Sequence, residues 1–201
     1  MRYFTSDLHI GHASLAHWRG FDDVSAHDQM ILSRLRESLA SDDELWMLGD
    51  VGKANVSTIR RLRECIPCER VHVVLGNHDE RSKFVSVGGF ATVEYYDEVG
   101  KDIRDGYKFV MSHYPMLDWN RAREGSYMLH GHIHSRPPLP TGVEPKDDFD
   151  ATFRRGYNER NRDAGIRRYD VGVDANDYRP VSTAHILEFF EGTDGRYIYE
   201  G

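Results

Sequence analysis

The sequence YMLHGHIH, residues Tyr127–His134, decides how we expect this chain to fold. Its first part, Tyr127–Leu129, is a short apolar run that predicts a buried β-strand ending at Gly131. Because successive side chains of an extended segment alternate, His132 and His134 project to the same side. Two imidazoles on one side of a strand end, beside a glycine that lets other backbone approach, suit a metal ion.

Four stretches upstream end in the same way, with a short apolar or β-prone run followed by Asp, His or Asn. The predicted strands are residues 3–6, 44–48, 71–75 and 107–112. The polar residues that follow them are Asp7, His9, Asp50, Asn77, His78 and His113. A histidine pair alone is a weak signal, but its repetition at successive strand ends favours one shared site.

The first ninety residues alternate between strands and helices. Ile31, Leu35 and Leu39 form an apolar stripe that predicts one helix, and a second helix begins at Asn55 and ends at Pro67. This alternation predicts a parallel, layered α/β arrangement. In such folds the site lies at the carboxyl ends of the strands.

The pattern changes after residue 90. Ala91–Val99, Lys101–Arg104 and Tyr107–Ser112 are predicted strands separated by turns that contain glycine. Short strands joined by such turns predict antiparallel hairpins, and hence a second sheet.

A proline-containing and locally basic stretch, residues 135–168, follows the histidine pair. We interpret it as a loop or lid inserted into a single domain that covers residues 1–201. A late strand at 169–174 and a final helix after Pro180 complete the expected fold.

Composition limits the classes of function. The chain has 201 residues, enough for one α/β domain, and its formal net charge of −7 disfavours non-specific binding to nucleic acid or anionic membranes. No apolar run is long enough to span a membrane, and Met1 leads directly into the first predicted strand. We therefore expect no signal peptide, no membrane partner and a cytoplasmic location. Cys65 and Cys68 lack a second pair and are interpreted as reduced thiols.

The donors at the strand ends indicate the kind of metal. Carboxylate, carboxamide and imidazole groups suit Mn, Fe, Zn or Co, and we favour Mn. The set is too large for one tetrahedral ion but suffices for two divalent ions that share a carboxylate. Two ions about 3.5–4 Å apart can activate water and polarise a phosphoryl oxygen. Their charge exceeds that of Asp7 and Asp50, which favours a phosphate anion even in an acidic protein.

Five ordered motifs resemble those of the calcineurin-like metallophosphoesterases. Two further features, Gly11-His12 and residues 171–176 followed by Pro180-Val181-Ser182, resemble the small bacterial and phage members. The five motifs are Asp-x-His at 7–9, Gly-Asp at 49–50, Gly-Asn-His-Asp at 76–79, a lone histidine at 113 and Gly-His-x-His at 131–134. The resemblance implies an α/β fold, a four-layered α-β-β-α sandwich with two mixed β-sheets. It also implies a metal-dependent phosphoric ester hydrolase.

The resemblance assigns a role to each matched position. The ligands of one metal ion would be Asp7, His9, Asp50 and His134, and those of the other Asp50, Asn77, His113 and His132. Asp50 would bridge the two ions. His78 resembles the histidine that contacts the substrate phosphate and protonates the leaving group after attack by a metal-bound hydroxide. Asp79 would orient His78.

Phosphodiesters or nucleotides are the expected substrates. Asn77 and His78 are expected to contact the phosphate, and His12, directly after the first motif, is a further candidate. Arg154 and Arg155 would reach a remote phosphate from the lid, because arginine binds phosphate through two parallel hydrogen bonds.

Two other functions are weighed against this one. A DNA or RNA nuclease of the same family is disfavoured by the negative charge, so nucleic acid is a less favoured partner than a small phosphate ester or nucleotide. A non-catalytic scaffold that kept the fold is disfavoured by the complete ligand set. Trp18, Phe21 and Trp119 could line a pocket for a base, although we favour core packing for them. The sequence indicates no oligomeric state.

Overall fold

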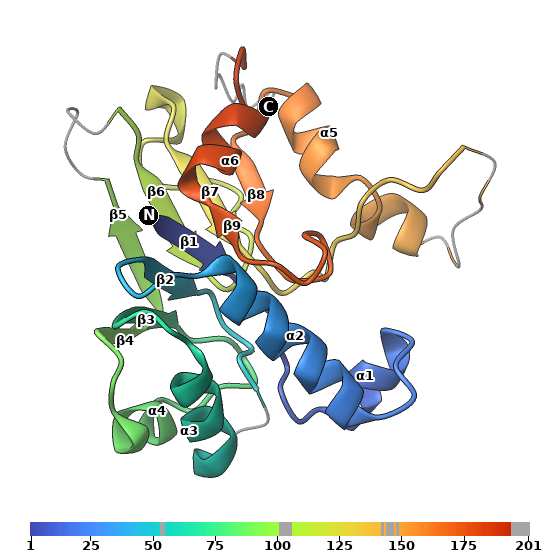
Figure 1. Ribbon diagram of the computed structural model, residues 1–201. Coiled ribbons are helices and arrows are strands. Elements are labelled where there is room, and N and C mark those ends of the chain that lie inside the picture. Colours follow the sequence, from blue (N-terminus) through green and yellow to red (C-terminus); the bar gives the residue numbers. More distant parts are fainter. Residues whose placement is uncertain (53–54, 101–105, 142, 144–146, 148, 194–201) are drawn as a thin grey trace.

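A computed structural model describes residues 1–52, 55–100, 106–141, 143, 147 and 149–193 (Figure 1). The strands are β1 (Arg2–Thr5), β2 (Glu44–Met47), β3 (Arg70–Val74), β4 (Thr92–Glu94), β5 (Tyr96–Val99), β6 (Phe109–Ser112), β7 (Tyr127–His130), β8 (Arg168–Asp170) and β9 (Val181–Ser182). The α-helices are α1 (Ala13–Trp18), α2 (Val24–Ser38), α3 (Val56–Cys65), α4 (Arg81–Val87), α5 (Tyr157–Asp163) and α6 (Thr183–Phe189). A 3₁₀ turn covers Ala122–Glu124, and a π-helical turn covers Asp150–Arg154.

The first sheet has the strand order β4-β3-β2-β1-β9. Strands β1 to β4 are parallel, whereas β9 runs antiparallel to β1. The parallel register places Phe4 beside Trp46 and Trp46 beside His72. This arrangement follows from the β-α alternation, because a helix must return the chain before a parallel neighbour can pair.

The second sheet has the order β5-β6-β7-β8. Only β5 and β6 are antiparallel, and β6, β7 and β8 run parallel. The predicted fold class, with two mixed sheets, is confirmed. The expected strand Ala91–Val99 is divided between the sheets, since β4 pairs with β3 and β5 pairs with β6. The expected strand Lys101–Arg104 lies outside the described residues.

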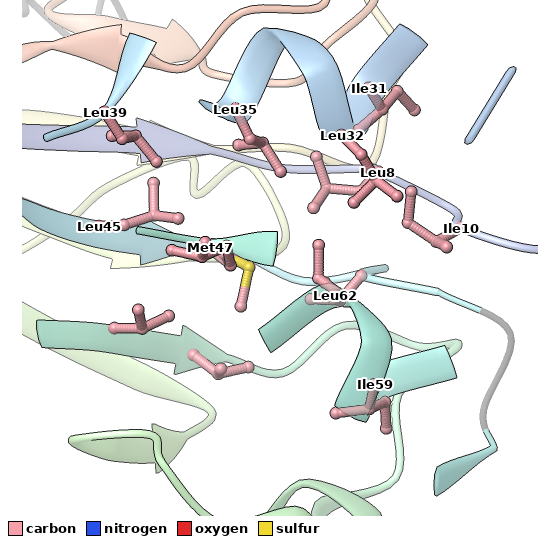
Figure 2. Close-up of a cluster of buried hydrophobic side chains, with 14 of the residues drawn as sticks. Leu8, Ile10, Ile31, Leu32, Leu35, Leu39, Leu45, Met47, Ile59 and Leu62 are labelled. Atoms are coloured by element: carbon pink, nitrogen blue, oxygen red, sulfur yellow. The ribbon is translucent and has the colours of Figure 1, made fainter. Parts of the chain in front are cut away.

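Apolar side chains separate the layers. Helices α2, α3 and α4 cover one face of the first sheet, and Figure 2 shows Leu35 and Leu39 near Leu45 and Met47 of β2. A second cluster lies between the sheets and includes Phe109 from β6. The outer face of the second sheet is covered more thinly, by a small cluster around the 3₁₀ turn.

The segment 135–168 is more ordered than a plain loop in the part that the structure describes. It contains the π-helical turn and α5, and α5 lies against β8 (Figure 1). Two buried hydrogen bonds between Asn158 and the backbone of Asp170 hold this packing. No described helix has the length and apolar character needed to cross a membrane.

Candidate metal centre

Seven predicted ligands follow the carboxyl ends of five parallel strands. They are Asp7 and His9 after β1, Asp50 after β2, Asn77 after β3, His113 after β6, and His132 and His134 after β7. The two sheets meet at this edge, because Ser6 after β1 pairs with Gly172 after β8 and accepts a backbone hydrogen bond from Val173. Residues far apart in the sequence therefore surround one point.

Asp50 lies at the centre of this group. Its Oδ2 atom is 3.5 Å from Nε2 of His9 and 3.5 Å from Nε2 of His113. Nε2 of His78 lies 4.0 Å from the same oxygen. One carboxylate thus contacts members of both predicted ligand sets, which is the placement that a bridging ligand needs.

Asp7 is also shared between two groups of potential ligands. In one group, donor atoms of Asp7, His9 and His134 lie within 4.8 Å of one another, and in the other those of Asp7, Asp50 and His113 do. The backbone N–H of His132 donates to both Asp7 oxygens, at 3.1 and 3.0 Å. The sequence assigned Asp7 to one ion only, whereas the geometry places its carboxylate near both groups.

The remaining predicted ligands lie on the solvent side. Oδ1 of Asn77 is 3.1 Å from Nε2 of His113, and the rings of His113 and His132 have centroids 5.1 Å apart. The side chains of Asn77 and His132 are exposed. The structure therefore gathers all seven predicted ligands, with a buried part around Asp7 and Asp50 and an open part around Asn77 and His132.

Hydrogen bonds at Nδ1 orient two of the histidines. Nδ1 of His113 lies 2.9 Å from the carbonyl oxygen of Leu48, and Nδ1 of His134 lies 2.8 Å from Oδ2 of Asp174. Since these oxygens only accept hydrogen bonds, both Nδ1 atoms donate. The Nε2 lone pair of each neutral ring is then available for a metal, as is usual for metal-binding histidines.

One buried nitrogen tests whether a metal fits here. Nε2 of His9 is buried, and in the described part of the chain it has no hydrogen-bond partner. A buried polar atom without a partner costs about 1–3 kcal/mol, so proteins rarely keep one without a use. A divalent cation between His9 and Asp50 would satisfy this atom, and the oxygen and nitrogen donors around it suit Mn, Fe, Zn or Co.

The backbone at this edge is unusual. Five of the seven predicted ligands have positive φ angles, namely Asp7, His9, Asp50, His132 and His134. Few residues other than glycine adopt this conformation, and it is maintained only where the surrounding structure compensates its cost. Glycines let the neighbouring backbone approach the two carboxylates closely. A Cβ on Gly131 would overlap Asp7, and one on Gly76 would overlap Asp50. Such clustered strain is typical of functional sites.

Burial and charge move the pKa values of these groups in opposite directions. Burial, aided by the charge of His134, lowers the pKa of His9 to about 3, and burial raises the pKa of Asp7 to about 7. Burial opposes the charged forms of Asp50 and His113 too, but their mutual hydrogen bond and attraction outweigh it. The pKa of Asp50 falls to about 2, and that of His113 rises to about 9. An incoming cation would therefore displace the proton from His113.

His78 and His12 lie at the rim. The side chain of His78 is 51% exposed, and its ring centroid lies 5.3 Å from that of His9 and 5.9 Å from that of His12. His12 is the N-cap of α1, where its Nδ1 accepts a hydrogen bond from Leu15. Both rings therefore border the candidate metal centre on its solvent side.

Asp79 has a different environment from the one we expected. Its two oxygens accept backbone N–H groups of Asp50, Val51 and Gly76, at 2.7 to 3.1 Å. These bonds connect the loop after β2 with the loop after β3. In the structure Asp79 thus holds the backbone around Asp50, and His78 instead meets Asp50, its backbone N–H donating to Oδ1 at 2.9 Å.

The sequence did not reveal the support behind His134. Asp174 accepts from His134 and is held by Arg19, whose Nε and Nη2 donate to Oδ1 and Oδ2 at 2.9 and 2.6 Å. Arg19 also donates to the backbone oxygen of Asp7 at 2.7 Å. The Asp174 side chain is 3% exposed and that of Arg19 fully buried. Nothing local in the sequence marks Arg19, because Asp174 is 155 residues away along the chain.

The two arginines assigned to the lid have separate surroundings. Nε of Arg154 donates to the backbone oxygen of Ile133 at 3.2 Å, and its guanidinium lies 5.1 Å from the ring centroid of Trp18. Arg155 instead pairs with Asp150 at 2.9 Å. Trp18, for which we favoured core packing, lies beside the site, with its ring 5.8 Å from that of His134.

Comparison with known proteins agrees with this geometry. Residues 3–147 match the sequence model of the calcineurin-like phosphoesterase superfamily domain. The Gene 66 protein of Mycobacterium phage L5 is 30% identical in an alignment of 159 positions that covers 66% of this chain and 77% of that protein. The Gene 66 protein of Mycobacterium phage D29 is 28% identical over 172 residues, covering 72% of this chain and 83% of the relative.

One solved structure supports the fold. A protein of unknown function from Aquifex aeolicus matches with a TM-score of 0.65, over 94% of this chain and 98% of its own. The two sequences are 23% identical, so this likeness concerns the fold alone.

Proposed function

This chain belongs to the calcineurin-like phosphoesterase superfamily, and we propose that it hydrolyses phosphate esters with two divalent metal ions, acting on phosphodiesters or nucleotides. The observation that carries this proposal is the position of Asp50. One oxygen of this carboxylate lies within 4.0 Å of imidazole nitrogens from His9, His78 and His113. A carboxylate among imidazoles, on strained backbone, is suited to hold cations and not to support the fold alone.

Each ion has its own set of ligands in this proposal. Asp7, His9, Asp50 and His134 would hold one ion, and Asp50, Asn77, His113 and His132 the other. We favour Mn because the set mixes carboxylate, carboxamide and imidazole donors and contains no thiolate. When bound, the two ions would supply Lewis-acid activation of water and of a phosphoryl oxygen.

The residues of the chain supply the remaining chemistry. Asn77 and His78 would bind the phosphate, and Nε2 of His78 would donate a proton to the departing oxygen. Its exposed position supports this role, because the leaving group departs toward solvent. His12 would contact the phosphate from the N-terminus of α1. Arg154 and Arg155 are retained as candidates for contact with a remote group, and we treat residues 1–201 as one domain.

The test measures turnover of bis(p-nitrophenyl) phosphate by Mn-loaded protein. We expect activity that Asp50→Asn abolishes. Asp177→Asn, an identical change at a 77% exposed carboxylate, should leave the rate unchanged. An absence of turnover with Mn, Fe, Zn and Co alike would refute the proposal and favour the scaffold. Preferred cleavage of DNA or RNA, with salt-sensitive binding, would favour the nuclease instead.

A further inference from the structure

A cavity of about 510 Å³ lies directly beside the metal centre. Its lining includes His132 and Ile133, which follow β7, and Phe149, Phe153 and Tyr157, which come from the segment before and within α5. His132 is also one of the predicted metal ligands. The cavity and the metal centre therefore share a wall, and a molecule bound by the metals would have one side open to this cavity.

Two phenylalanines give the cavity its character. Phe149 is 53% exposed and Phe153 is 57% exposed. Their ring centroids are 5.0 Å apart and the planes are inclined by 31°. Burial of such rings would be favourable, and their exposure beside the candidate metal centre leaves apolar faces available to a ligand.

Cationic groups accompany these rings. The guanidinium of Arg154 lies 4.9 Å from the ring centroid of Phe149, and its Nε donates to Ile133 at 3.2 Å. Arg154 thus connects the aromatic segment with the loop that carries His132. Arg168 also lines the cavity, held by a hydrogen bond from Nη1 to the backbone of Met116. The cavity is apolar and aromatic in its walls but positive at its edge.

We propose that this cavity binds the nucleoside part of a substrate whose phosphate lies at the metal centre, with Phe149 and Phe153 as residues that determine specificity. This inference rests on the proposed function and deepens it. Planar rings and a planar guanidinium suit an aromatic base, because bases stack on aromatic and arginine faces. The positive edge suits the neighbouring phosphate. The volume lies within the range of about 300–1,000 Å³ that is usual for ligand pockets.

The two phenylalanine rings are expected to affect KM and not kcat. They contact the remote part of the substrate and not the phosphorus, so they contribute to binding of the ground state and the transition state alike. Their removal should raise KM and leave kcat unchanged. Stacking of one base on an aromatic side chain corresponds to about a 5- to 150-fold effect on binding.

The experiment compares two diesters with the same leaving group, thymidine 5′-(p-nitrophenyl phosphate) and methyl p-nitrophenyl phosphate, on Mn-loaded protein. We expect Phe149→Ala/Phe153→Ala to raise KM for the thymidine ester at least fivefold and to leave the methyl ester unchanged. The control is Tyr95→Ala, which removes an aromatic side chain from a residue that is 67% exposed and far from this cavity in sequence. Phe149→Leu/Phe153→Leu keeps the apolar surface without the rings. Its KM for the thymidine ester should lie between those of the wild type and the alanine variant.

Several outcomes would overturn the assignment. Equal losses on both esters would assign the cavity to the shared nitrophenyl group or to structural support. An octyl ester that depends on the two rings as strongly as the thymidine ester would identify an aliphatic occupant. Self-association of the wild-type chain that the double variant abolishes in sedimentation would identify a second copy of the chain as the occupant.

A binding measurement separates this inference from the proposed function. Calorimetry with thymidine 5′-phosphate and with inorganic phosphate requires no turnover. Wild-type protein should bind the nucleotide more tightly than phosphate, and Phe149→Ala/Phe153→Ala should bind both alike. Tight nucleotide binding without hydrolysis would overturn the enzyme and keep the pocket. Hydrolysis without any nucleotide preference would keep the enzyme and overturn the pocket.

Discussion

Asp174→Asn tests whether the buried support of His134 matters for the metal centre. The carboxylate accepts three hydrogen bonds, from Nε and Nη2 of Arg19 and from Nδ1 of His134. Asparagine has the same shape but only one accepting oxygen, so its NH₂ group must face at least one donor. The substitution also removes the negative charge that compensates the fully buried guanidinium of Arg19.

The size of the effect follows from this environment. Breaking a buried ion pair by removing one partner costs about 3–5 kcal/mol. We expect the lower end, about 3 kcal/mol, because Arg19 keeps its bonds to the backbone oxygens of Asp7 and Leu8. In a chain of this size that loss lowers Tm by roughly 6–12 °C. Loss of the partner that orients a ligating histidine weakens metal binding by about 10- to 100-fold.

Two measurements and a matched control make the test specific. Thermal unfolding by circular dichroism gives Tm, and competition with a chelator gives the Mn affinity. Asp177→Asn carries the same change three residues later on a 77% exposed side chain, and both quantities should match those of the wild type. Arg19→Met/Asp174→Leu removes both charges. It should recover only part of the Tm, because the backbone oxygens of Asp7 and Leu8 lose Arg19 as a donor. It should not recover the metal affinity, because His134 still lacks its partner.

Mn affinity similar to that of the wild type in either variant would refute a role of Asp174 in orienting His134. Asp174→Asn with Mn affinity within twofold of the wild type would show that Asp174 supports the fold and not the ligand. Recovery of the metal affinity in the double variant would lead to the same conclusion, because Leu cannot accept the hydrogen bond from His134.

Three further predictions concern the site itself. Asp50→Ala should lower the occupancy of both metals in elemental analysis of protein grown with Mn, and unchanged two-metal occupancy would disprove a bridging role. His78→Ala should keep its metals but lose more rate on an alkyl ester than on a nitrophenyl ester, up to about 10²–10⁴-fold, because poor leaving groups need a proton; equal losses on both would indicate phosphate positioning. Metal affinity of the metal-free protein should rise about tenfold per pH unit between about pH 7 and pH 9, and more steeply below pH 7, because burial raises the pKa of Asp7 to about 7. Burial opposes the proton on His113, but Asp50 and Asp7 outweigh it and raise the pKa of His113 to about 9. This proton must therefore leave before Nε2 can bind a metal ion. A metal affinity independent of pH would contradict this.

The sequence by itself determined the ends of the strands. Short apolar runs followed by Asp, His or Asn are local patterns, and they predicted where β1, β2, β3, β6 and β7 end. The order of the motifs predicted the family and the fold class, and both are confirmed. Helix α3 shows how local this information is, because Asn55 caps it through Thr58, three residues away, as predicted.

The direction of strand pairing could not be determined in this way. The sequence predicted antiparallel hairpins within residues 91–112, and β5 does pair antiparallel to β6. It predicted no direction for β7, which pairs parallel to β6 and β8. An isolated strand carries no record of its neighbour, because parallel and antiparallel pairing satisfy the same backbone groups. The division of residues 91–99 between two sheets likewise depends on which strand edges lie nearby in the folded chain.

Only the tertiary structure decided the surroundings of the predicted ligands. Arg19 meets Asp174 across 155 residues, and Asp79 holds the backbone around Asp50 across 29. The cavity beside His132 is lined by the segments after β6 and β7, by the π-helical turn and by α5, whose contributing residues extend from Pro115 to Tyr157 along the chain. Side chains with no periodic or local signature come together only when packing closes the chain, because burial depends on the whole fold and not on the residue type. The sequence could therefore name the candidate ligands, but not the residues that orient them or the pocket that they adjoin.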